Sequence, residues 1–239
     1  MCSAHSPMMA AGMFTPSPVF TSWLAQQPRI VLGSASSSRK TIMSDLLGKH
    51  PYLVRTADID EKAIRRPDPR ELVMTLAHAK AEAIRAKMRD AGEDVSQGYL
   101  ITCDQVVVHE GIILEKPESL DEARSFIQGY GRAPCATVGS ILCTNFSTGQ
   151  TFECVDEARI HFTPFPEAII AQILAQGECM YCAGGLKIED PLVVPQVICI
   201  EGTEDTVMGM SKLLVMQLLL QAAGLQTDPA IGQLLQPRS

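Results

Sequence analysis

Three charged residues in the sequence could carry chemistry. Asp104 interrupts an apolar strand pattern, Lys80 lies on the apolar face of an expected helix, and Lys116 directly precedes Pro117. A buried carboxylate needs a cation or hydrogen bonds to offset the loss of water. Lysines beside it would keep it ionised and neutralise phosphate charge during transfer. Together with the serine-rich turn over 34–40 and the acidic pair Asp60-Glu61, the three residues indicate metal-assisted phosphoryl or nucleotidyl hydrolysis. Taken singly, Asp104 could be a bulge residue and each lysine could extend its ammonium group to solvent.

A serine-rich turn could supply an anion site. The stretch from Ser34 to Lys40 links a short apolar strand to a helix and ends in two cations. Free N–H groups at a helix N-terminus and the helix dipole attract phosphate. Arg39 could then bind phosphate oxygens through its planar guanidinium group. The alternative is an ordinary N-cap followed by a solvated Arg-Lys pair.

Acidic residues offer ligands for a divalent cation. Asp60 and Glu61 end an acidic segment, and carboxylate oxygens are ligands that Mg²⁺ prefers. Asp104 could hold the same ion or polarise a water molecule itself. The sequence leaves open whether Asp60 or Glu61 is the closer ligand and how many ions bind.

Other common chemistries lack their signatures. The sequence has no P-loop, dinucleotide-binding, zincin or nucleophile-elbow motif. Cys179 and Cys182 form an isolated C-x-x-C pair, which is a weak indication of zinc or redox chemistry. With 20 Lys and Arg against 27 Asp and Glu, the formal charge of −7 argues against a partner that is a nucleic acid polymer. A small phosphorylated substrate remains compatible with that charge.

The elements that must position these residues follow from the apolar periodicity. We expect an α/β fold with a mixed sheet, because strands and helices alternate and hairpins occur among them. The strand that begins at Tyr99 is expected to break at Asp104 and Gln105 and to resume at Val106. Strands are expected near 30–32, 54, 99–103, 106–108, 112–114, 135–144, 151–162 and 192–200, and helices over about 40–47, 69–90, 119–129, 166–177 and 211–224.

The two ends of the chain differ from the middle. Residues 1–27 show no sustained period, so we expect a flexible extension, structure from Arg29 onward, one domain over 28–226 and a tail over 227–239. The first 28 residues lack Lys and Arg, which excludes the usual signal and transit peptides. The most apolar stretch, 213–223, is too short to span a bilayer. We therefore expect a cytoplasmic protein with reduced cysteines and no membrane association.

Seven short segments, in this order, resemble the motifs of the Maf nucleoside triphosphate pyrophosphatases. They extend from about Ile30 to Gly224, which is nearly the whole chain that we expect to be ordered. The segments are Ser34-Ala35-Ser36-Ser37-Ser38-Arg39-Lys40, Asp60-Glu61, Leu76-Ala77-His78-Ala79-Lys80-Ala81, Cys103-Asp104-Gln105-Val106, Lys116-Pro117, the stretch from Cys182 to Glu189, and Val207-Met208-Gly209-Met210.

This resemblance implies an activity and a fold. It implies hydrolysis of a nucleoside triphosphate between the α and β phosphates, with a divalent cation such as Mg²⁺ or Mn²⁺. It also implies an elongated mixed sheet flanked by helices, two lobes with a cleft between them, as in ITP pyrophosphatases, and a possible homodimer. By the same resemblance, the catalytic residues would be Asp104, Lys80 and Lys116, the substrate contacts Ser34, Ser36, Ser38, Arg39, Gln105, Lys187 and Glu189, and the metal ligands Glu61 and Asp104.

The catalytic strand also bears on the substrate. One branch of the family carries Asp-Thr there and looks suited to dTTP and UTP, whereas the other carries Asp-Gln and prefers 7-methyl-GTP. This chain has Asp104-Gln105, and Ser38, Gln105 and Glu189 fall at positions associated with base choice. A methylated guanine is cationic and presents N–H donors, which Glu189 and the amide oxygen of Gln105 could accept. The sequence therefore favours 7-methyl-GTP or a related modified nucleotide.

Two alternatives stay open. The first is a pyrophosphatase for dTTP and UTP. The second is a nucleotide-binding regulator of cell division without turnover, although the set of Lys80, Asp104 and Lys116 argues for catalysis. The chain also departs from the family motif, since Ser37 replaces a proline and Lys40 an arginine. The reaction class tolerates these changes better than the exact substrate does.

Overall fold

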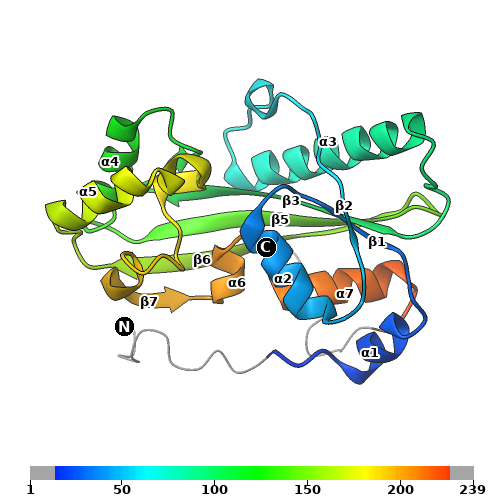
Figure 1. The fold of residues 1–239 in the computed structure, drawn as a ribbon. Helices are drawn as coiled ribbons and strands as arrows, with labels where there is room; N and C mark the ends of the chain where they lie inside the picture. The colour runs from blue at the N-terminus through cyan, green and yellow to red at the C-terminus, as the bar shows by residue number, and fades with distance from the viewer. Residues whose placement is uncertain (1–13, 227–239) are drawn as a thin grey trace. The chain divides into compact units, whose positions relative to one another are not determined.

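A computed structural model describes residues 14–226 of the chain (Figure 1). The strands are β1 (Ile30–Gly33), β2 (Leu53–Val54), β3 (Tyr99–His109), β4 (Ile112–Leu114), β5 (Cys135–Asn145), β6 (Thr151–Phe162) and β7 (Val197–Glu201). The helices are α1 (Pro18–Leu24), α2 (Ser37–Leu47), α3 (Pro69–Asp90), α4 (Leu120–Gly129), α5 (Glu167–Gln176), α6 (Glu204–Val207) and α7 (Lys212–Ala222). Every expected helix is therefore present.

The strands form one mixed sheet, which confirms the predicted α/β class. Its order is β2-β1-β3-β5-β6-β7, and β4 pairs with β3 outside this path. Strand β1 is parallel to β2 and to β3, whereas β4 is antiparallel to β3 and β7 is antiparallel to β6. Parallel neighbours need a crossover connection, and α2 and α3 lie in those connections.

The described chain divides into two compact units. The first unit comprises residues 14–104, 140–156 and 209–226, and the second comprises residues 105–139 and 157–208. Strand β3 passes from the first unit to the second between Asp104 and Gln105. The elongated outline and the cleft between two lobes remain predictions.

The first unit is layered around β1 and β3. Helix α3 lies on one face of these strands, and α2 and α7 pack together on the other (Figure 1). Gly33 allows the close contact with α3, because a Cβ atom there would lie 2.7 Å from Ile84 Cδ1 and 2.6 Å from Thr102 Cγ2. The core on the α3 side consists of Val31, Ala77, Ala81, Ile84, Met88, Leu100, Leu142 and Phe146.

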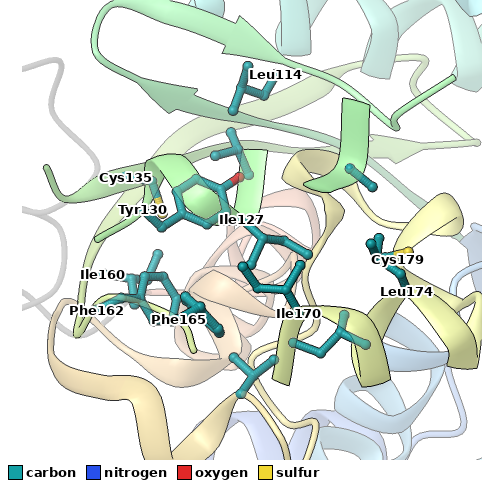
Figure 2. Close-up of a cluster of buried hydrophobic side chains, with 14 residues drawn as sticks. Leu114, Ile127, Tyr130, Cys135, Ile160, Phe162, Phe165, Ile170, Leu174 and Cys179 are labelled. Carbon is teal, nitrogen blue, oxygen red and sulfur yellow. The ribbon is translucent and has the colours of Figure 1, made fainter. Parts of the chain in front are cut away.

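The second unit has an aromatic core of its own. Figure 2 shows Tyr130 and Phe162 among aliphatic side chains from α4 and α5. The Tyr130 hydroxyl donates to the Gly184 carbonyl at 2.6 Å, which satisfies its polar end inside the core. Gly184 also donates its N–H to the Glu115 carbonyl at 3.0 Å. These two bonds fix the segment that precedes Lys187.

Two strand predictions are wrong in detail. Strand β3 does not break at Asp104, because a buried lysine offsets the cost of the carboxylate and the ladder continues. The expected strand over 192–200 begins only at Val197, after a 3₁₀ helix over Val194–Gln196. Pro195 lies in that turn, and a proline has no N–H to donate to a sheet ladder.

The prediction that structure begins at Arg29 is also wrong. Helix α1 starts at Pro18, and the Ser17 hydroxyl caps it by accepting from the Phe20 N–H. Phe20 and Trp23 are buried, and Trp23 packs edge-on against Tyr99 of β3 with ring centroids 5.3 Å apart. A helix of seven residues is too short to show a clear period. The predictions for residues 1–13 and 227–239 lie outside the described residues.

Membrane and cysteine predictions have separate outcomes. Within residues 14–226, no helix combines the length and the apolar character that crossing a bilayer requires. Six cysteines are free thiols, namely Cys103, Cys135, Cys143, Cys154, Cys179 and Cys182. Cys199 is disulfide-bonded, so the expectation of reduced cysteines is wrong at that position. Sequence spacing alone does not reveal such pairings.

We predict that α1 is an integral part of the first unit. Trp23→Ala should lower the free energy of unfolding by about 3 kcal/mol, because it removes a large buried side chain and leaves a cavity. Val19→Ala on the same helix is the control, since Val19 is 46% exposed and its loss should change stability by less than ~0.5 kcal/mol. Urea unfolding measures both, and equal effects would show that α1 contributes no core.

Candidate active site

A buried ammonium group lies between two carboxylates in the first unit. Lys80 Nζ is 2.5 Å from Asp104 Oδ1 and 3.0 Å from Glu61 Oε1. Lys80 is 9% exposed and Asp104 is 7% exposed, whereas the Glu61 side chain is 45% exposed. Three of the residues predicted for catalysis and metal binding therefore meet at one point, and one side of this cluster faces solvent.

Two elements bring Lys80 and Asp104 together. Helix α3 begins at an Asp68 N-cap, and Lys80 follows Val73, Leu76 and Ala77 on the face that packs against the sheet. Alternate side chains of a strand share one face, so Thr102 and Asp104 both point toward α3. The Thr102 hydroxyl donates to the Ala77 carbonyl at 2.9 Å and fixes the helix against β3.

Ser140 is a site residue that sequence reasoning missed. Its hydroxyl accepts from the Asp104 N–H at 3.2 Å and donates to the Val73 carbonyl of α3 at 2.7 Å. It is completely buried on β5 and links three elements around Asp104. The available signal was a hydroxyl in a buried strand, but Thr137 and Thr144 of the same strand give the same signal.

The burial of Asp104 sets its acidity. Desolvation raises the pKa of the Asp104 carboxyl above its ordinary value, and the Lys80 ammonium and the Arg39 guanidinium oppose that rise. The nearby Glu61 carboxylate adds to the increase. A carboxylate with a raised pKa is a better proton acceptor, so Asp104 is suited to act on a water molecule or a hydroxyl group.

Asp60 and Glu61 have different contacts. Asp60 Oδ1 accepts from the Lys62 N–H at 3.1 Å and caps the short helix Glu61–Ala63. Glu61 instead reaches Lys80 and Asp104. No group of three or more His, Cys, Asp or Glu side chains within residues 14–226 has the arrangement of a metal site. Two carboxylates still suit Mg²⁺, which completes its shell with water and substrate phosphates.

The serine-rich turn caps α2, as one of the two alternatives expected. Ser36 Oγ accepts from the Arg39 N–H at 3.4 Å, and Ser34 Oγ accepts from the Ser36 N–H at 3.2 Å. Ser38 is half-buried in the first turn of α2. This alternative also assumed that the Arg39 side chain is solvated, and that assumption is wrong. Its Nε donates to the Gly209 carbonyl and its Nη1 to the Cys103 carbonyl, each at 3.1 Å.

The second unit holds the other predicted residues. Gln105 Nε2 donates to the Thr206 and Val207 carbonyls at 3.0 and 3.1 Å, so its amide group has a fixed orientation. Lys187 Nζ is paired with Glu178 Oε2 at 2.7 Å. Glu189 is exposed two residues further on, and Lys116 is exposed between β4 and α4. All four of these residues lie in the second unit, and their contacts are described within that unit.

The C-x-x-C pair does not have the features of a redox centre. Burial raises the pKa of the Cys182 thiol to about 11 and also raises that of Cys179. Redox-active cysteines usually have a lowered pKa, because the thiolate is the reactive form. The second interpretation of this pair, a zinc site, also lacks further ligands among residues 14–226.

We predict a corresponding pH dependence for Cys182. Because its pKa is about 11, the fraction of thiolate should keep rising well above neutral pH. Its alkylation rate with iodoacetamide should therefore increase roughly tenfold per pH unit between about pH 7.5 and 9.5. Peptide-resolved mass spectrometry measures this rate. A plateau below about pH 8.5, near the ordinary cysteine pKa, would contradict the prediction.

The fold and the lysine-carboxylate cluster define an α/β protein with a charged site suited to phosphate chemistry. A family model described as Maf-like protein matches residues 29–222. A 7-methyl-GTP pyrophosphatase from Dictyostelium discoideum is 34% identical over 197 residues, which cover 81% of this chain and 97% of that protein. This chain therefore belongs to the Maf-like family, as the resemblance predicted.

Two further relatives carry related names. A nucleoside triphosphate pyrophosphatase from Synechococcus sp. (strain CC9605) is 31% identical over 188 residues, covering 76% of this chain and 96% of that protein. A 7-methyl-GTP pyrophosphatase from Vibrio vulnificus (strain CMCP6) is 27% identical over 194 residues, covering 81% and 94%. The similarity thus extends over almost the full length of these relatives.

Proposed function

We propose that this chain hydrolyses a nucleoside triphosphate to the monophosphate and pyrophosphate, with 7-methyl-GTP or a related modified nucleotide as substrate. The observation that carries the proposal is the buried Lys80 ammonium group between Asp104 and Glu61. Relatives named nucleoside triphosphate pyrophosphatase support the reaction class, and relatives named 7-methyl-GTP pyrophosphatase support the substrate.

The proposed chemistry assigns Asp104 the central role. Its carboxylate accepts a proton from the water that attacks the α phosphorus, the α–β anhydride bond breaks and pyrophosphate leaves. Lys80 holds this carboxylate in place. Glu61 and Asp104 would hold Mg²⁺ or Mn²⁺, which neutralises phosphate charge and lowers the pKa of bound water. Lys116, Ser34 and Ser36 are the proposed contacts to the substrate phosphates, and Ser38 is a proposed contact to the base.

The proposed base contact depends on the fixed orientation of Gln105. Its amide nitrogen uses both hydrogens on the two backbone carbonyls, so the amide oxygen is left as an acceptor. Guanine presents paired N–H donors that suit such an acceptor together with the Glu189 carboxylate. Lys187 would contribute to the same contact region. We also propose a cytoplasmic location and a homodimer, for which the family resemblance is the support.

The first prediction concerns Asp104. Asp104→Asn should lower kcat by roughly 10²–10⁴-fold because it removes the proton acceptor. Nucleotide affinity, measured by calorimetry without a divalent cation, should change little, since an asparagine keeps the size and polarity of the side chain. Asp60→Asn is the matched control on the same acidic segment, and it should keep its activity. Full activity of Asp104→Asn would contradict a catalytic role for this carboxylate.

The second prediction concerns the substrate. Purified protein with Mg²⁺ should release pyrophosphate faster from 7-methyl-GTP than from dTTP or UTP, because guanine offers N–H donors to Gln105 and Glu189. It should also prefer 7-methyl-GTP to GTP, because the methylated base is cationic and the Glu189 carboxylate is negative. Pyrophosphate release under initial-rate conditions measures kcat/KM for each. A preference for dTTP and UTP would refute the substrate and leave the reaction intact.

The third prediction separates the two acidic residues. Glu61→Gln should raise the Mg²⁺ concentration needed for half-maximal activity roughly tenfold or more, since metal affinity depends on charged oxygen ligands. Asp60→Asn should leave this concentration unchanged, because Asp60 caps a backbone N–H instead. A magnesium titration of both variants tests this, and the reverse order of effects would assign the ligand to Asp60.

A further inference from the structure

The backbone next to Asp104 lies beyond the end of a neighbouring strand. Tyr99 donates its N–H toward the β1 side, to the Arg29 carbonyl at 2.9 Å. Every second residue of a strand points its backbone groups to the same edge, so the Cys103 N–H and carbonyl also point toward β1. The last residue of β3 that pairs with β1 is Thr102, which lies opposite Gly33. The Cys103 carbonyl therefore lies one residue beyond the ladder that holds β3 on this edge.

Arg39 supplies the bond that β1 no longer provides. Its Nη1 donates to the Cys103 carbonyl at 3.1 Å, and its Nε donates to the Gly209 carbonyl at 3.1 Å. A buried carbonyl without a partner would be costly, and a guanidinium group can serve two acceptors at a fixed angle. Arg39 thus links the first turn of α2, the residue before Asp104 and the segment before α7.

The segment before α7 is shaped to receive this bond. Gly209 has a φ of +115°, a backbone conformation that a side chain disfavours. The next residue, Met210, is buried and its sulfur lies 3.5 Å from the Cys103 sulfur. Ser211 then caps α7 by accepting from the Leu214 N–H. Gly209 and Met210 belong to a segment that the sequence singled out without giving it a function.

We propose that Arg39 and Gly209 are positioning residues, which hold the β3 backbone at Cys103 and thereby aim the Asp104 carboxylate at Lys80 and the substrate. This inference rests on the proposed hydrolase function for its kinetic consequence. It differs from the phosphate contact expected for Arg39, because the two bonds use the guanidinium group to order the protein itself. A lysine at this position keeps the charge and loses the paired donors.

Arg39→Lys tests the proposal through the division between kcat and KM. A small displacement of a catalytic group lowers turnover strongly, so kcat should fall roughly 10–100-fold while KM changes less than about threefold. Gly209→Ala should act in the same direction, because the strained backbone turns its carbonyl away from Arg39. Arg55→Lys is the control. Arg55 also donates to a backbone carbonyl, that of Val54, and it pairs with Glu93.

A second readout needs no substrate. Cys103 is completely buried and contacts Arg39 and Met210. The rate at which a thiol reagent labels it therefore reports how readily this backbone opens. Site-resolved mass spectrometry should show labelling of Cys103 that is roughly tenfold faster or more in Arg39→Lys and Gly209→Ala, because local opening becomes easier. Arg55→Lys should leave both kcat and this labelling rate close to the wild-type values.

The outcomes distinguish a failure of the positioning role from a failure of the proposed hydrolase function. A raised KM with kcat retained in Arg39→Lys would overturn it in favour of a direct phosphate contact. Unchanged Cys103 labelling in both variants would overturn it as well. If the wild-type protein hydrolyses none of the nucleotides, the proposed function fails, and faster Cys103 labelling would still support the backbone role of Arg39. If Arg39→Lys does not fold, Gly209→Ala decides.

Discussion

The site depends on one constraint, which is that the buried Lys80 side chain needs carboxylate partners to offset its loss of water. Lys80 meets this constraint because two carboxylates share it, one buried on β3 and one at the solvent-facing side. Removing one partner of a buried ion pair typically costs about 3–5 kcal/mol. Because Asp104 would still pair with Lys80, Glu61 could bind another partner without leaving the ammonium group unpaired.

The surroundings of this cluster show how the fold maintains it. Ser140 fixes the Asp104 backbone to β5 and α3, and Thr102 fixes α3 to β3. On the opposite face, Arg39 binds the carbonyl of Cys103. The backbone on both sides of the Asp104 side chain is therefore held by side chains from other elements. Such support is what a catalytic carboxylate requires in order to keep its orientation.

The sequence predicted the elements and the main charged cluster, because both follow from local patterns. Apolar periodicity located the helices, and an inward lysine with an intrastrand aspartate indicated their pairing. It missed what depends on distant partners. Asp104 looked like a strand break because its compensation comes from α3. Ser140, the bonds of Arg39 and the burial of Trp23 each involve residues far away in the chain, which no short segment reveals.

The central claim is that Lys80 and Asp104 act as one catalytic unit. A double-mutant cycle on kcat/KM, with Lys80→Met, Asp104→Asn and the two combined, tests it most directly. Residues that act as a unit are strongly non-additive, so the double variant should be within about threefold of the weaker single variant. Losses that multiply would show that Lys80 and Asp104 contribute independently, and would contradict the claim.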